Sequence, residues 1–260
     1  MTKPIQVKNI ILGEGMPKIC VPLTESKSEE ICTQAVNAKT AGAELVEWRA
    51  DFYCNLCNED DLRDTLEELI RILDGIPLIF TIRTKKEGGN AELSTEEYIR
   101  INLAAARTKK ADFVDVEVFG EEEEKKKSLI LQLQKEDCRV IASSHDFEKT
   151  EEKEALVQRF KRMDETGADI LKIAVMPKNF EDVAAIMQAT KEMCTCTSKP
   201  LISMSMGSIG SISRIAGENF GSCLTFATVG AASAPGQFPI QELRVMMEAL
   251  HQENRRQETK

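Results

Sequence analysis

The order of apolar segments along the chain limits its possible folds most strongly. Short runs rich in β-branched residues alternate eight times with longer amphipathic stretches. The expected strands are Ile19–Leu23, Glu44–Asp51, Pro77–Arg83, Phe113–Val118, Arg139–Ser144, Asp169–Val175, Pro200–Met206 and Cys223–Thr228. The expected helices are Lys27–Thr40, Asp60–Leu73, Ser94–Lys109, Glu121–Lys135, Lys149–Thr166, Phe180–Met193, Ile209–Glu218 and Pro239–Gln252. This repetition predicts an α/β fold of the (β/α)8 or TIM-barrel type.

The length and the first strand-to-helix connection separate this fold from its main alternative. A doubly wound open sheet normally ends after about five or six strands and carries a glycine-rich phosphate loop after the first. The connection Pro22–Lys27 contains no glycine. A length of 260 residues suits one barrel, so residues 1–260 are predicted to form a single catalytic domain. The apolar run in Ile5–Gly15 is expected to form a hairpin that closes the bottom of the barrel.

Composition and charge exclude several classes of function. A net charge of −9 argues against binding to nucleic acid or to an anionic membrane. No apolar run reaches membrane length, and the first residues lack the pattern of a signal peptide, so a cytoplasmic location is expected. The eight cysteines are then expected to be free thiols. The pair Cys54-Asn-Leu-Cys57 lacks the second, well-spaced ligand pair of a zinc site, so no metal is predicted.

Polar residues interrupt the expected strands at their carboxyl ends, where barrel enzymes place their active sites. Residues two apart on a strand, such as Glu47 and Arg49, share one of its faces. These side chains are therefore predicted to converge on one site. The set comprises Glu47, Arg49, Arg83, Glu87, Asp115, Glu117, His145, Lys172, Met204, Met206 and, after the seventh strand, Arg214.

Lys172 is the most informative member because a charged amine inside an apolar strand loses hydration. One interpretation is a structural lysine paired with a carboxylate. The other is a nucleophile, because burial favours the neutral amine that attacks a carbonyl. Arg49 and Arg83 are expected to favour the neutral amine as well. The position of the lysine alone leaves both interpretations open.

His145 is one of two histidines in the chain, and the other, His251, is expected on the surface of the last helix. Because His145 ends the strand next to that of Lys172, a proton carrier is favoured over a purely structural role. Glu87 is placed to support or tune it. The three arginines of the set suit a substrate that carries a carboxylate.

Taken together, the motifs resemble those of type I 3-dehydroquinate dehydratases, in the same order and over nearly the whole chain. Any one of them is weak, but the set is specific. Two positions depart from the family pattern: Ser144 replaces a larger residue, and Pro22 stands where some members have serine. The motifs are Glu47-Trp-Arg49-Ala-Asp51, Thr81-Ile-Arg83, Glu87-Gly-Gly, Asp115-Val-Glu117, Ser143-Ser-His145-Asp-Phe, Lys172-Ile-Ala, Ser203-Met-Ser-Met206-Gly and Ala234-Pro-Gly-Gln237.

This resemblance implies a lyase of the shikimate pathway that converts 3-dehydroquinate to 3-dehydroshikimate without a metal or organic cofactor. It implies that Lys172 forms a Schiff base and that His145, with Glu87, moves protons. Arg214 is implied to hold the substrate carboxylate, with Ser233 and Gln237 near the carboxylate or the leaving hydroxyl. The ring hydroxyls would contact Glu47, Arg49 and Arg83, and the apolar side would be lined by Met204, Met206 and Phe226. The family is often dimeric, so a homodimer is expected.

Two other functions compete with this interpretation. One is a Schiff-base aldolase for phosphorylated sugars, for which glycines after the seventh strand would grip the phosphate. The other is a non-catalytic binding barrel, which the joint presence of Lys172, His145 and Glu87 disfavours. The segment Gly230–Pro239, rich in alanine, glycine and proline, is expected to be a lid that is open without substrate. The sequence does not separate a biosynthetic role from quinate breakdown.

Overall fold

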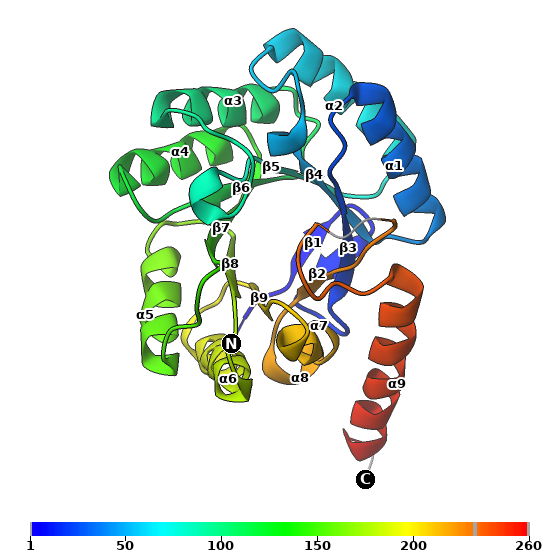
Figure 1. The fold of residues 1–260 in the computed structure, drawn as a ribbon, viewed down its shortest axis with the longest axis vertical. Coiled ribbons are helices and arrows are strands. Elements are labelled where there is room, and N and C mark those ends of the chain that lie inside the picture. Colours follow the sequence, from blue (N-terminus) through cyan, green and yellow to red (C-terminus); the bar gives the residue numbers. More distant parts are fainter. Residues whose placement is uncertain (1, 231–232, 259–260) are drawn as a thin grey trace.

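Parallel strands and surrounding helices form the (β/α)8 barrel that the sequence predicts (Figure 1). The computed structural model describes residues 2–230 and 233–258. The eight barrel strands are β3 (Lys18–Leu23), β4 (Leu45–Arg49), β5 (Leu78–Thr81), β6 (Phe113–Glu117), β7 (Arg139–Asp146), β8 (Ile170–Val175), β9 (Leu201–Ser205) and β10 (Leu224–Phe226). They pair in chain order, and β10 returns to pair with β3. An isolated parallel bridge between Leu201 and Ser222 connects β9 with the residues just before β10.

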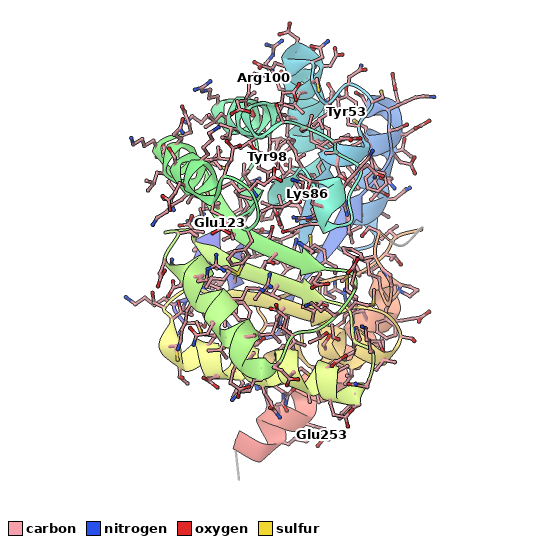
Figure 2. The ribbon with its side chains drawn as sticks, turned by 60° about the vertical axis from the view of Figure 1, so that its left-hand side comes forward. Tyr53, Lys86, Tyr98, Arg100, Glu123 and Glu253 are labelled. Atoms are coloured by element: carbon pink, nitrogen blue, oxygen red, sulfur yellow. The ribbon has the colours of Figure 1, made fainter. Side chains whose placement is uncertain are left out.

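Helices cover the outside of the barrel because their apolar faces pack on the strands. They are α1 (Ser28–Thr40), α2 (Glu59–Leu73), α3 (Thr95–Arg107), α4 (Glu123–Lys135), α5 (Lys153–Asp164), α6 (Phe180–Cys196) and α9 (Ile240–Glu258). Short 3-10 turns follow three strands, at Ala50–Phe52, Lys85–Glu87 and Ile209–Ser211. Figure 2 shows charged side chains such as Arg100 and Glu253 on the outer surface, and both are exposed. None of the described helices is both long and apolar enough to cross a membrane.

Local sequence signals explain where several helices begin. A capping box begins α3: the Ser94 hydroxyl accepts from the Glu97 N–H, and the Glu97 carboxylate accepts from the Ser94 N–H. Asn58 and Asn179 accept from backbone N–H groups in the same way at α2 and α6. Each cap satisfies backbone donors that the first turn of a helix leaves without partners.

The prediction of a single helix at Ile209–Glu218 is wrong. A 3-10 turn, the short helix α7 (Ile212–Ile215) and the short helix α8 (Gly217–Phe220) replace it. The Ser213 hydroxyl hydrogen-bonds to the backbone of Ser205 and Gly210, which holds this segment against the end of β9. Gly210 lies so close to the Ser205 carbonyl that a Cβ would stand 2.4 Å from its oxygen.

A second difference concerns the last helix, which the sequence ends at Gln252. In the structure α9 continues to Glu258. The polar composition of this segment hides the helix, because an exposed helix end needs little apolar surface.

An antiparallel hairpin closes the bottom of the barrel, as predicted. Strands β1 (Ile5–Val7) and β2 (Ile10–Leu12) pair with each other. Their buried side chains Val7, Ile10 and Leu12 join an apolar cluster with residues at the starts of the barrel strands, such as Leu45 and Phe113. The barrel interior is therefore apolar at one end, and the polar strand ends lie at the other.

Candidate active site

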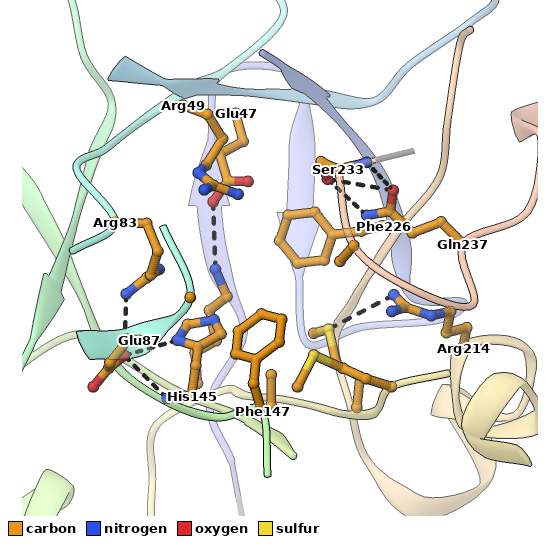
Figure 3. A pocket seen from close by; sticks show the side chains of 16 residues that line it. Glu47, Arg49, Arg83, Glu87, His145, Phe147, Arg214, Phe226, Ser233 and Gln237 are labelled. Atoms are coloured by element: carbon orange, nitrogen blue, oxygen red, sulfur yellow. Dashed lines mark hydrogen bonds and ion pairs between the residues drawn. The ribbon is translucent and has the colours of Figure 1, made fainter. Parts of the chain in front are cut away.

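One pocket of about 480 Å³ opens at the carboxyl ends of the strands. The residues to which the sequence gives a catalytic or substrate-binding role all line it: Glu47, Arg49, Arg83, Glu87, His145, Lys172, Met204, Met206, Arg214, Phe226, Ser233 and Gln237. Asp115 and Glu117, which were also expected at the site, do not line the pocket. Figure 3 shows Arg49 and Glu47 on one wall, Arg214 with Gln237 across the pocket from them, and His145 beside Phe147 at the bottom of the view. The sequence did not assign Gly88, Phe147, Ala174 and Ala234, which also line the pocket.

Lys172 projects into the barrel from β8, a strand buried along its whole length. Its Nζ lies 3.0 Å from Asp115 Oδ2 and 3.3 Å from Glu47 Oε1. The same nitrogen stands 4.8 Å from the centre of the Phe226 ring. Two carboxylates and an aromatic face therefore surround the amine. The carboxylates are the partners expected of a structural lysine, and the position in the pocket is the one expected of a nucleophile.

Arg83 links the carboxylates of the site into a buried network. Its Nη2 donates to Asp115 Oδ1 at 2.7 Å, and its Nη1 lies within 3.3 Å of oxygens of Glu117, Glu87 and Ser143. The sequence expected Arg83 to act on the lysine directly. In the structure, its guanidinium faces carboxylates.

Arg49 is held in a similar way. Its Nε and Nη2 each donate to one oxygen of Asp51 at 2.8 Å, a bidentate pair. Asp51 also accepts from the backbone N–H groups of Arg83 and Asn90. Asp51 therefore fixes both Arg49 and the chain after β5. The sequence pattern suggested no separate role for this aspartate.

His145, at the end of β7, makes two hydrogen bonds to one oxygen of Glu87. Its Nδ1 lies 2.9 Å and its backbone nitrogen 3.0 Å from Glu87 Oε2. Nε2 is left as the ring nitrogen without a protein partner among the described residues. The pairing that the sequence expected between these two side chains is present.

Burial and charge set the protonation of this pair. Burial raises the pKa of the Glu87 carboxyl to about 8, repulsion from Glu117 adds to the rise, and attraction to Arg83 opposes it. Burial lowers the pKa of His145 well below its ordinary value, and the charges of Arg83 and Lys172 lower it further. At neutral pH the imidazole is therefore uncharged, which is the form a general base requires.

Arg214 is buried on the opposite wall, with 1% of its surface exposed. Nη2 donates to the Pro235 carbonyl at 3.0 Å, Nη1 lies 3.7 Å from Met204 Sδ, and Nε has no partner. No carboxylate among the described residues pairs with it. Burial lowers the pKa of Arg214 to about 10, so the side chain remains charged at neutral pH. A charged guanidinium with an unused donor suits an anionic group on a ligand.

The loop after β10 covers this wall. The Ser233 N–H donates to Gln237 Oε1 at 2.9 Å, and the Gln237 amide donates back to the Ser233 hydroxyl at 3.0 Å. The Pro235 carbonyl also accepts from the Gly207 N–H, which docks the loop on the end of β9. Of the predicted lid, residues 231 and 232 lie outside the described part of the chain. Its opening without ligand stays a prediction.

Phe147 closes the pocket beside the histidine. A Cβ on Gly88 would stand 2.4 Å from the Phe147 ring, so the glycine allows the ring to lie over the turn that carries Glu87. One signal in the sequence points to Phe147, because it lies two residues beyond His145 in the chain. Asp115 and Ser143 were visible as polar residues in strands, but not as partners of Arg83.

A second cavity adjoins the pocket, and Glu87 and His145 line both spaces. Its volume is about 1330 Å³. Within residues 2–230 and 233–258, no group of three or more His, Cys, Asp or Glu side chains is arranged to hold a metal ion. The eight cysteines are free thiols, as the sequence predicts.

Comparison with known proteins gives the family. The model of the type I 3-dehydroquinase family matches residues 19–254. The 3-dehydroquinate dehydratase of Clostridium kluyveri is 43% identical over 247 residues, which are 95% of this chain and 97% of that protein. The 3-dehydroquinate dehydratase of Listeria welshimeri is 43% identical over 249 residues, covering 96% of this chain and 98% of its own.

Solved structures agree with the sequence matches. The type I 3-dehydroquinate dehydratase of Clostridium difficile, crystallised with covalently modified comenic acid, has a TM-score of 0.92 and 42% identity, covering 97% of this chain and 100% of its own. The 3-dehydroquinate dehydratase of Geobacillus kaustophilus has a TM-score of 0.93 and 36% identity, covering 96% and 97%. The resemblance seen in the motifs is confirmed, and the chain belongs to the type I 3-dehydroquinase family.

Proposed function

We propose that this chain dehydrates 3-dehydroquinate to 3-dehydroshikimate through a Schiff base on Lys172, with His145 as the general acid and base and Glu87 as its partner. One observation carries the proposal. A buried lysine amine stands in a pocket that also contains an uncharged histidine and, on the opposite wall, a guanidinium without a carboxylate partner among the described residues. These groups match a substrate that has both a ketone and a carboxylate.

The reaction begins with condensation of the Lys172 amine and the substrate ketone, which releases water and, with the uptake of one proton, leaves an iminium. An iminium withdraws electrons more strongly than the ketone, so the neighbouring α-proton becomes acidic. His145 takes that proton and an enamine forms. The enamine expels the β-hydroxyl, to which His145 returns the proton, and a second water leaves. Hydrolysis of the imine then frees the product and the lysine.

The remaining residues have binding roles in this proposal. Arg214 holds the carboxylate through its planar fork, with Ser233 and Gln237 beside it. Glu47, Arg49 and Arg83 surround the ring hydroxyls. The apolar side of the ring contacts Met204, Met206 and Phe226. All of these side chains line the pocket. Homodimerisation, a cytoplasmic location and organisation as one domain stay predictions.

Borohydride trapping tests the covalent step. Protein is reduced in the presence of 3-dehydroquinate, and the adduct is located by peptide mass spectrometry. The adduct is expected on Lys172, and Lys172→Ala should lose both adduct and turnover. Its fold should survive because Asp115 keeps its contacts with Arg83 and Ser143. Lys178→Ala, an exposed lysine just beyond the same strand, is the matched control.

His145→Ala separates binding from proton transfer. The amine remains, so the adduct should still form, whereas turnover should fall by about 10²–10⁴-fold. An adduct that maps to another lysine, or a His145→Ala enzyme with normal turnover, would contradict the assignment. Trapping with a phosphorylated sugar instead of 3-dehydroquinate would favour the aldolase alternative.

A further inference from the structure

Asp115 is a buried carboxylate whose two oxygens have different partners. Oδ1 accepts from Arg83 Nη2 at 2.7 Å and from the Ser143 hydroxyl at 2.6 Å. Oδ2 lies 3.0 Å from Lys172 Nζ. Its side chain has 0% exposure, and it does not line the substrate pocket. Arg83 and Ser143 therefore hold the carboxylate from one side and aim its other oxygen at the reacting nitrogen.

The chemistry proposed for Lys172 creates a need for such a group. An ammonium and a ketone condense to an iminium and water, so the nitrogen carries one positive charge before and after. The nitrogen of an imine is less basic than that of an amine, and it loses its proton more readily. Only the protonated form is a strong electron sink. A fixed negative charge beside the nitrogen favours that form.

We propose that Asp115 is a further catalytic residue, whose carboxylate keeps the imine nitrogen on Lys172 protonated, and that Ser143 positions it. This inference rests on the function proposed above. The carboxylate acts through its charge, since the imine keeps its own proton until hydrolysis. Ser143 acts only through Asp115 and Arg83, which its hydroxyl joins.

Of the groups that face the Lys172 nitrogen, Asp115 is better suited to keep the imine protonated than Glu47, Phe226 or Cys20. Glu47 lies farther away, at 3.3 Å, accepts from the Thr81 hydroxyl and lines the pocket, where bound substrate competes for it. The Phe226 ring is uncharged. Burial raises the pKa of Cys20 well above its ordinary value, so this thiol is neutral.

The charge on Asp115 is stable. Burial alone would raise its pKa, but Arg83 and Lys172 hold the pKa of Asp115 well below its ordinary value, with a smaller effect of His145. His145 is itself uncharged at neutral pH because burial lowers its pKa. Asp115 is therefore the closest fixed negative charge to the reacting nitrogen that substrate does not contact.

Two hydride reagents test this role. Cyanoborohydride reduces the protonated imine, whereas borohydride also reduces the neutral one, so the ratio of the two adducts reports the protonated fraction. The ratio is measured by intact mass with 3-dehydroquinate from about pH 6 to about pH 9. In Asp115→Asn, cyanoborohydride trapping should disappear about 1–3 pH units lower than in the parent, because an opposite charge within hydrogen-bond reach is lost. Borohydride trapping should persist.

Adjacent serines supply a matched pair of milder variants. Ser143→Ala should shift the ratio in the same direction by a smaller amount. Ser144→Ala should leave it unchanged, because the Ser144 hydroxyl contacts Arg159 instead. If Asp115→Asn does not fold, the serine pair decides. Parental profiles in both Asp115→Asn and Ser143→Ala would overturn this inference alone, whereas absence of any borohydride adduct in the parent would overturn the proposed function with it.

Discussion

At the scale of single residues, the contact between Glu87 and His145 has an effect on stability as well as on chemistry. Two nitrogen atoms of His145, from the ring and from the backbone, converge on Glu87 Oε2. Burial nevertheless raises the pKa of Glu87 to about 8. The folded chain therefore keeps a proton on this pair at a pH where an unfolded chain has released it.

The first prediction follows from that difference. Between the unfolded value of about 4.3 and the folded value of about 8, the folded state binds one proton more at Glu87, so the free energy of unfolding falls as pH rises. His145 has the opposite effect, because its pKa is lowered in the folded state, but that effect ends above about pH 6.5. Between about pH 6.5 and 8, Glu87→Gln should show a shallower decline in stability than the parent.

Urea unfolding at several pH values in this window measures the decline. Glu92→Gln is a suitable control, since Glu92 is an exposed carboxylate whose pKa is lowered by its hydrogen bond to Lys85. Parallel stability curves for Glu87→Gln and the parent would show that Glu87 does not hold the proton.

The second prediction concerns Arg214. Lysine at this position keeps a positive charge but lacks the planar fork, so one charged hydrogen bond to a carboxylate is lost. That bond contributes about 1.5–3 kcal/mol, which corresponds to a KM about 10–150-fold higher for Arg214→Lys. Steady-state kinetics measure this value, with Arg139→Lys at the other end of the barrel as the control. An unchanged KM would remove Arg214 from carboxylate binding.

At the scale of elements, the break after β9 and the loop after β10 build one wall of the pocket together. The periodicity of apolar residues predicts one continuous helix after β9, which would run along a single straight axis. Instead, Ser213 ties the segment to β9, and Arg214 is buried beneath the Pro235 carbonyl. Periodicity did not reveal this break because Ser213 and Gly210 act through contacts with the backbone of Ser205, which a pattern of apolar residues does not record.

The third prediction uses the closest backbone contact of that loop. Gly236 has φ +78°, and a Cβ there would stand 2.3 Å from the Gly207 carbonyl oxygen. Gly236→Ala should lift the loop from β9 and raise KM, while the melting temperature changes little. Gly230→Ala is matched to it, because φ is +91° but no atom lies within 4 Å of the added Cβ. Equal KM values for the two variants would mean that docking on Gly207 is unimportant.

The sequence predicted which strands and which side chains meet, but not how those side chains pair. Strand order and the two-residue repeat place Glu47, Arg49 and Lys172 at one end of the barrel whatever their rotamers. The contacts of Asp115 and Arg83 depend on the register between β5, β6 and β7, which one chain's pattern does not specify. For that reason, the sequence placed Asp115 at the site without a specific role and did not reveal that Arg83 pairs with it.

At the scale of the whole molecule, the two ends of the barrel have separate tasks. The hairpin β1–β2 fills the bottom with apolar side chains, and the charged groups lie at the top. A change at the bottom should therefore alter stability without altering chemistry.

The fourth prediction tests that separation. Leu12 is 1% exposed, so Leu12→Ala should lower the free energy of unfolding by about 2–5 kcal/mol. The turnover number of the fraction that stays folded should not change. Ile11→Ala, on the other face of the same strand and half-buried, should cost less. Denaturant unfolding and kinetics on the same samples measure both quantities, and a loss of turnover in folded Leu12→Ala protein would contradict the separation.

The position of His145 on a single wall has a stereochemical consequence. Glu87 holds the imidazole from the ring nitrogen and from the backbone, so the ring cannot move to the other side of the pocket. A proton carrier fixed in this way reaches one face of a bound six-membered ring. Because the proposed reaction uses the same imidazole to remove the α-proton and to protonate the departing hydroxyl, both groups leave from that face. The dehydration is then a syn elimination, and substrate deuterated on one face only would reveal it by the label that the product retains.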